Sequence, residues 1–201
     1  MTIWNIGLES WIIQDGNYPD FRKGQLAEFA LFFQLYSDIT KAKGEDLQAA
    51  PIKEAEYNVT AKVIFTGRES WGIDFGLLAY TNQPPPRGLK VGDTFSADIW
   101  LGIDYYLYFQ ALSKIETVPP MIYTWKIQQI RMQTAPFIKT ISTEPGRLFG
   151  KEIFVRDQQK LAYKEIDATS ASTDDDGSAN YMLTCQEVIA PVRRTKSGGW
   201  G

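Results

Sequence analysis

Three acidic residues and a tryptophan lie along the segment VGDTFSADIWLGID, residues 91–104. Asp93 is near its start, Asp98 in its middle and Asp104 at its end, and Trp100 separates the last two acids. An aromatic ring beside carboxylates can anchor a basic partner or stack on a sugar, and two carboxylates about 5 to 9 Å apart can cleave a glycosidic bond. The alternative is that these acids only keep a β-sheet protein soluble.

Neighbouring rings and acids extend this pattern into a candidate binding surface. We define the acidic aromatic strip as Trp71, Asp74, Asp98, Trp100, Asp104, Tyr105, Tyr106 and Tyr108. Aromatic side chains surrounded by carboxylates can increase both the affinity for a basic protein partner and the rate at which it associates. The alternative is a purely structural role, in which the rings fill the core and the acids lie at turns or on a solvent-exposed face. An outward-facing Trp100 would be unfavourable in water, so we expect a partner, a second copy or the C-terminal segment to cover it.

The residue types that most enzymes and metal sites use are scarce. The chain has no histidine, which excludes Ser-His and Cys-His pairs and most zinc or iron sites. It contains neither a GxxxxGK[ST] phosphate loop nor a GxGxxG turn. The aspartates at 174–176 precede Gly177, but they are consecutive and position 183 is Leu, which does not fit an EF-hand. We therefore expect a solvated turn there, and no metal, cofactor or enzymatic activity.

Apolar residues recur at every second position, which is the pattern of half-buried strands. Residues 29–36 and 59–65 show it clearly. In the segment 91–104, one face carries only aliphatic or aromatic residues and alanine: Phe95, Ala97, Ile99, Leu101 and Ile103. Asp98 and Asp104 lie on the opposite face, which we expect to be exposed to solvent. Asp93 follows a glycine and is expected in the turn that starts the strand.

Further strands are expected at residues 71–78, 123–132, 153–155 and 181–187. A change of apolar parity inside 123–132 predicts a β-bulge at Gln128 or Gln129. Residues 44–57 contain good helix formers interrupted by a proline, which predicts one or two short helical turns. Residues 105–115 are expected to run from a strand into a short helix.

This pattern predicts a mainly β fold, all-β or α+β with little helix. The expected form is a curled antiparallel sheet or barrel at residues 1–116, with a β-rich segment at 117–201 packed on it as one cooperative unit. The pattern V-G-D-x-hydrophobic at 91–95 resembles the start of a strand in oligonucleotide-binding-type barrels, so an OB-like barrel is one form considered. The stretches WIIQDG at 11–16 and WGIDFG at 71–76 share spacing, and either chance or two related hairpins would explain this.

Charge and cysteine content indicate in which cellular compartment the protein functions and which classes of partner it can bind. Residues 1–116 carry a net charge of −5 and residues 117–201 a net charge of +2. The negative charge of residues 1–116 disfavours binding of nucleic acid. Cys185 is the single cysteine, which excludes an intramolecular disulfide, and its apolar surroundings predict a small buried side chain. The chain has no signal-peptide pattern and no apolar run long enough to cross a membrane as a helix. These features favour a cytoplasmic protein.

Three functional hypotheses follow. The first is a non-enzymatic interaction protein of the inhibitor or immunity type, in which the strip binds a basic protein partner or mediates self-association. The second is a carbohydrate-type ligand binder, or a carboxylate-based hydrolase that uses the same strip. The third is an OB-like binder of single-stranded nucleic acid, which would need a basic groove with exposed stacking rings.

Overall fold

The computed structural model describes residues 2–42, 46–142 and 151–191. About 51% of the described residues are in strands and about 10% in helices, which confirms the predicted mainly β class. The strands are β1 (Ile3–Glu9), β2 (Leu26–Phe29), β3 (Leu31–Leu35), β4 (Thr40–Lys41), β5 (Gln48–Lys53), β6 (Glu56–Thr66), β7 (Trp71–Asp74), β8 (Leu78–Thr81), β9 (Thr94–Ile103), β10 (Tyr123–Gln133), β11 (Phe137–Ser142), β12 (Lys151–Arg156), β13 (Tyr163–Ile166) and β14 (Asn180–Ile189). The helical turns are α1 (Ser10–Gln14), α2 (Leu107–Gln110), η1 (Leu112–Lys114), η2 (Gln158–Lys160) and η3 (Asp174–Gly177).

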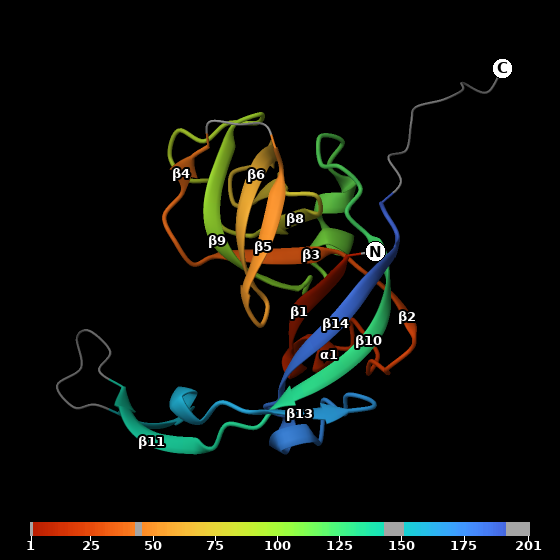
Figure 1. Cartoon of the computed structure of the whole chain (residues 1–201), viewed down its shortest axis with the longest axis vertical. Helices are drawn as coiled ribbons and strands as arrows, with labels where there is room; N and C mark the ends of the chain where they lie inside the picture. The colour runs from red at the N-terminus through yellow and green to blue at the C-terminus, as the bar shows by residue number, and fades with distance from the viewer. Residues whose placement is uncertain (1, 43–45, 143–150, 192–201) are drawn as a thin grey trace.

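Five strands close into a barrel (Figure 1). Their order is β3-β8-β7-β6-β9, and β9 pairs again with β3. All neighbours are antiparallel except β3 and β8, which are parallel. The barrel therefore confirms the predicted curled sheet, and it has the strand number of an oligonucleotide-binding-type barrel. The finer OB-like assignment stays a prediction.

The barrel interior follows the predicted alternation. The five apolar residues of β9 that were expected to face inward are all buried in the main core. Phe29, Leu31 and Phe33 are buried in the same core, and the rings of Phe33 and Trp71 meet edge to face at 5.0 Å between centroids. Asp93 lies in a turn before β9, where its carboxylate accepts a 2.8 Å hydrogen bond from the backbone amide of Lys90.

A second group of strands continues from the barrel through β1 (Figure 1). The order is β13-β10-β14-β1, and β2 also pairs with β10. β1 joins the barrel by a parallel contact with β9 at Gly7 and Gly102. Residues 117–201 thus contribute β10, β13 and β14, while β1 and β2 come from residues 1–116. The register between β10 and β14 shifts between Ile127 and Gln129, which confirms the predicted bulge.

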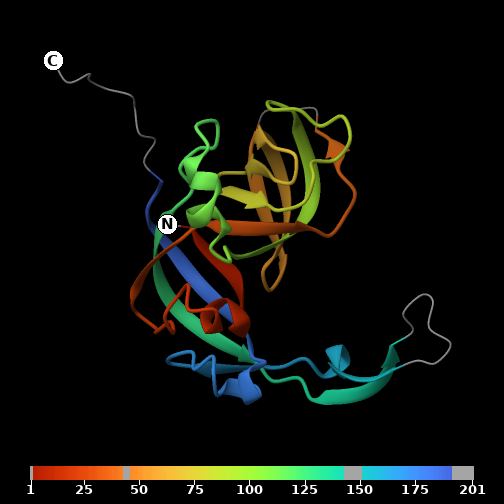
Figure 2. The same cartoon turned by 180° about the vertical axis from the view of Figure 1, so that it is seen from behind.

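β11 and β12 form a separate two-stranded sheet, which we call the arm. In both views the arm extends away from the barrel at the lower end of the molecule (Figures 1 and 2). Residues 153–155 of the predicted strand lie in β12, so that prediction is confirmed. The arm pairs with no other strand of the described chain.

Two local predictions are wrong, the first of them because tertiary pairing outweighs local propensity. The helical turns expected at 44–57 are not found: residues 48–53 form β5, and residues 43–45 lie outside the described part. Pro51 fits because β5 is the last strand of the sheet and pairs only with β6, so one of its edges needs no hydrogen-bond donor. The strand expected from Tyr105 is also absent, because β9 ends at Ile103, whereas the short helix after it is present as α2.

The two similar stretches at 11–16 and 71–76 have different structures. Residues 11–14 belong to the helix α1, whereas residues 71–74 form the strand β7. The hypothesis of two related hairpins is therefore wrong, and the shared spacing does not reflect a common local structure.

Candidate functional site

The structure separates the acidic aromatic strip into three places. Trp71 is 1% exposed and belongs to the barrel core. Asp74 and Asp98 are half-buried and hold local hydrogen bonds: Oδ1 of Asp74 accepts from the amide of Gly76 at 2.9 Å, and Oδ1 of Asp98 accepts from the side-chain amide of Asn58 at 2.6 Å. Trp71 therefore contributes nothing to the surface of the strip, whereas Asp98 lies two residues from Trp100 on the outer face of β9.

Asp104 was expected on a wet face, and that prediction is wrong because its side chain is 0% exposed. A second, smaller core covers this end of β9. It comprises Ala30, Phe32, Phe65, Tyr80, Tyr108, Leu112, Val118 and Met121. α2 and η1 supply two of these residues, and they close over the outer side of the barrel where β9 ends.

The carboxylate of Asp104 is held by tyrosines. Tyr80 donates its hydroxyl hydrogen bond to Oδ1, and the backbone amide of Tyr108 donates to the same oxygen at 3.3 Å. Oδ2, like the hydroxyls of Tyr18 and Tyr105, is buried with no hydrogen-bond partner in the described part of the chain. Burial raises the pKa of Asp104 to about 6, and the hydrogen bond from Tyr80 opposes this rise.

Trp100 lies where the barrel meets β1. A Cβ atom on Gly7 or Gly102 would clash with the indole ring, so the two glycines let the ring lie flat against the β1–β9 contact. Trp100 is half-buried, and β1 supplies part of its cover, whereas we expected a partner, a second copy or the C-terminal segment to do so.

Trp100 also forms a wall of a cleft of about 260 Å³ between the barrel and the second group of strands. We call it the acidic aromatic cleft. Its lining includes three glutamates, one lysine and four large rings: Glu9, Glu54, Glu56, Lys53, Tyr36, Trp100, Tyr163 and Tyr181. The β5–β6 hairpin contributes Lys53, Glu54 and Glu56, and β14 contributes Asn180, Tyr181 and Met182.

The charges of this cleft are only partly paired. Lys53 contacts Glu56 at 3.4 Å, and the indole nitrogen of Trp11 donates a hydrogen bond to Glu9. Tyr163 donates a hydrogen bond to Glu54. One lysine therefore faces three carboxylates, which leaves the lining with a net negative charge.

Burial and the carboxylates of the cleft raise the pKa values of two of its tyrosines. Partial burial raises the pKa of Tyr36, and the charges of Glu56, Glu54 and Glu9 raise it further, against Lys53, which lowers it. Burial and the contact with Glu54 raise the pKa of Tyr163 to about 12. The phenols therefore stay neutral at physiological pH, and the carboxylates dominate the potential in the cleft.

Two further features distinguish the cleft from an ordinary surface hollow. Glu54 has a φ of 49°, in the left-handed region, where a non-glycine residue is strained by about 1 kcal/mol or more. The guanidinium of Arg131 lies over the ring of Tyr163, 5.4 Å from its centroid. The wall of the cleft therefore already shows the contact that a cation makes with one of its rings.

Of the predicted strip, only Trp100 lines the cleft. The glutamates could not be recognised in the sequence because Glu9 lies far from Glu54 and Glu56 in the chain, and no motif links them. A weak signal was present in KEAE at 53–56, where three charges occur at the end of an apolar alternation.

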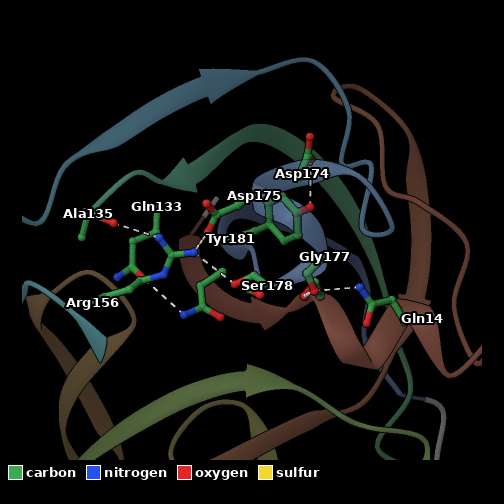
Figure 3. A network of polar contacts seen from close by, with 11 residues as sticks. Gln14, Gln133, Ala135, Arg156, Asp174, Asp175, Gly177, Ser178 and Tyr181 are labelled. Carbon is green, nitrogen blue, oxygen red and sulfur yellow. Dashed lines mark hydrogen bonds and ion pairs between the residues drawn. The ribbon is translucent and has the colours of Figure 1, made fainter. Parts of the chain in front are cut away.

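Arg156 fixes the base of the arm to neighbouring segments of the chain (Figure 3). It donates hydrogen bonds to the carbonyls of Ala135 at 3.0 Å and Ser178 at 3.1 Å, and it pairs with the carboxylate of Asp175. Gln133, which lines the cleft, is held in turn by the side chain of Asn180 at 3.1 Å.

The predicted turn at 174–176 is present, but two of its acids are engaged (Figure 3). Asp174 accepts hydrogen bonds from the hydroxyl of Tyr181 at 2.9 Å and from the amide of Ser170 at 2.8 Å. Asp175 has a φ of 49° and pairs with Arg156. The turn therefore links β14 to the arm, and its left-handed backbone aims the carboxylate of Asp175 at Arg156.

Cys185 is fully buried, as predicted, and burial raises the pKa of its thiol. Within residues 2–42, 46–142 and 151–191, no group of three or more Cys, Asp or Glu residues is arranged to hold a metal ion. No helix in these same ranges is long and apolar enough to cross a membrane.

The sequence matches no protein-family model, and it has no significant match among curated proteins or solved structures. The geometry and charge of the sites themselves are therefore the guide to function.

Proposed function

We propose that this chain is a non-enzymatic binding protein whose acidic aromatic cleft receives a basic side chain, arginine or lysine, from a protein partner. The observation that carries the proposal is the lining itself, in which three carboxylates and one ammonium surround a cleft lined by four large rings. Carboxylates complement a cation, and aromatic faces attract it through their electron-rich centres.

Arginine fits this lining better than lysine. Its planar guanidinium can stack on Trp100 or Tyr36 while donating paired hydrogen bonds to a glutamate. At about 260 Å³, the cleft is slightly smaller than a typical drug-sized pocket of about 300–1,000 Å³, which suits one side chain better than an oligosaccharide. The net charge of −5 on residues 1–116 would also attract a basic partner at long range.

The two rival hypotheses require site features that differ from those of the cleft. A glycoside hydrolase needs an acid with a raised pKa in its cleft. Asp104 has a raised pKa, but it does not line the acidic aromatic cleft. A binder of single strands needs a basic groove, and the lining described above has the opposite charge.

The test is an NMR titration of the labelled protein with N-acetyl-arginine amide. N-acetyl-citrulline amide has nearly the same shape without the charge, and maltose represents a neutral sugar. We expect arginine to shift the signals of Trp100 and Tyr163 with a Kd on the order of 1 mM, which is about −4 kcal/mol, and citrulline to bind at least tenfold more weakly.

The double variant Glu54→Gln/Glu56→Gln removes two of the three carboxylates while keeping their shape. It should weaken arginine binding at least tenfold, whereas Glu69→Gln, an exposed change outside the cleft, should leave it within twofold. Equal binding of arginine and citrulline, or a response to maltose alone, would overturn the proposal.

A further inference from the structure

A second pair of surfaces on this chain is apolar, and neither surface belongs to the acidic aromatic cleft. The first is the arm. Its exposed apolar side chains are Phe137 at 48%, Ile138 at 43%, Ile141 at 65%, Phe154 at 69% and Val155 at 37%. A two-stranded hairpin alone is marginally stable in water, because it needs a third strand or a packed layer to bury its apolar face.

The register of the arm shows how these side chains are arranged. Ile138 lies opposite Val155, and Thr140 lies opposite Ile153, so most of one face is uncharged, with Lys151 opposite Ser142 at its end. The other face carries a salt bridge of 2.6 Å between Lys139 and Glu152. Both faces therefore present apolar side chains, and no other strand of the described chain pairs with them.

The second surface is an apolar groove of about 1,090 Å³ on the outside of the barrel. Aliphatic residues and prolines dominate its lining, and Val91 and Ile115 at its rim are 59% and 47% exposed. Val118, Pro120 and Ile122 come from the loop that leads into β10. A groove of this volume exceeds the usual small-molecule pocket and can accept a peptide strand or hairpin.

The arm and the groove lie at opposite ends of the molecule. In both views the arm is at the lower end, whereas α2 and the loop after it, drawn in green, lie in the upper half (Figures 1 and 2). Arg156 fixes the base of the arm to the turn at 174–177 (Figure 3). An arm held in this direction cannot fold back into the groove of its own chain.

We propose that the arm of one copy docks in the apolar groove of a second copy. One chain carries both a projecting apolar element and a concave apolar surface, and contact between two copies covers both at once. The exposed arm side chains present roughly 500 Å² of apolar surface, given about 150–200 Å² for a whole side chain.

Docking covers mainly one face of the arm, and the face with Phe137, Ile141 and Phe154 carries about two thirds of this surface. With a similar area on the groove, one contact buries roughly 700 Å², and a reciprocal exchange of two arms brings a dimer to roughly 1,400 Å². This area lies in the range of stable, specific interfaces. Reciprocal exchange closes as a two-fold dimer, whereas one-way docking produces longer assemblies.

The experiment measures mass by sedimentation and light scattering across a concentration series. The arm variant is Ile141→Ser/Phe154→Ser and the groove variant is Val91→Asp/Ile115→Asp, all at exposed positions that should leave the melting temperature unchanged. We expect the natural sequence to assemble and each variant to raise the dissociation constant at least tenfold, towards the 22.8 kDa monomer.

Two controls make the test specific. Ile3→Ser/Leu26→Ser changes side chains that are 59% and 61% exposed but belong to neither surface, and it should assemble normally. A mixture of the arm variant and the groove variant should form a heterodimer, because the intact groove of one meets the intact arm of the other.

Three results would overturn the proposal. They are a natural sequence that stays monomeric at every concentration, assembly lost in the arm variant but kept in the groove variant, and a mixture that stays monomeric. The second result would indicate contact between two arms. Binding of arginine to the cleft is measured separately, so the failure of either proposal leaves the other intact.

Discussion

Replacement of the buried acid, Asp104→Asn, should stabilise the protein at neutral and alkaline pH. Asparagine keeps an oxygen that accepts the hydrogen bond from Tyr80, and it removes a charge from a site with no exposure to solvent. The carboxylate has one buried oxygen without a hydrogen-bond partner in the described residues, which makes its charged form unfavourable.

The magnitude follows from the pKa of Asp104, which burial raises from 3.8 to about 6. The native state binds this proton more tightly than the unfolded state, so the free energy of unfolding falls as pH rises from about 3.8 to about 6. About two pH units correspond to roughly 3 kcal/mol. The variant lacks this titration, so its advantage should approach ~3 kcal/mol at pH 8 and vanish below about pH 4.

The assay is urea unfolding of both proteins at a series of pH values, followed by tryptophan fluorescence. The difference between the two unfolding free energies isolates Asp104 from every other titrating group. Asp98→Asn is the matched control on the same face of β9, and its half-exposed side chain should change stability by less than about 1 kcal/mol. A variant that is less stable than the natural sequence at pH 8, or a difference that does not vary with pH, would refute the reasoning.

Three other changes test the packing around the candidate sites. Gly7→Ala should destabilise the fold by about 1–3 kcal/mol in urea unfolding, because the added methyl displaces Trp100; an unchanged midpoint would contradict that contact. Arg156→Lys keeps the charge but loses the guanidinium fork that reaches two carbonyls, so amide hydrogen exchange of β11 and β12 should accelerate about tenfold or more. The thiol of Cys185 should react with Ellman's reagent at least 100-fold faster in urea than in the native state, since burial raises its pKa and blocks access; immediate labelling of the native protein would argue against this burial.

Much of the barrel could be predicted because its information is local. Side chains alternate across a strand, so the apolar positions of residues 29–36, 59–65 and 95–103 define which face is buried. The bulge in β10 was visible for the same reason, as a one-residue change of parity. β5 was not predictable in this way, because its pairing with β6 stabilises a strand in a segment whose residues favour a helix.

The candidate site was harder to predict from the sequence than the barrel. The acidic aromatic cleft gathers residues from β1, the turn between β5 and β6, β9, β13 and β14. Its glutamates share neither a motif nor a fixed spacing, and only the closure of the barrel against the second group of strands brings them together. Trp100 was recognisable as a candidate because an aromatic residue stood on a face that also carried acids.

The amino-acid sequence determined that the chain would form strands, that they would curl around an apolar interior, and which residues of β9 would fill it. It could not determine what covers the outer face of the same strand. Asp98 and Asp104 share that face, yet one is half-exposed and the other fully buried. The difference arises because α2 and η1 close over only one end of β9, and the burial of a side chain depends on which distant segments pack against it.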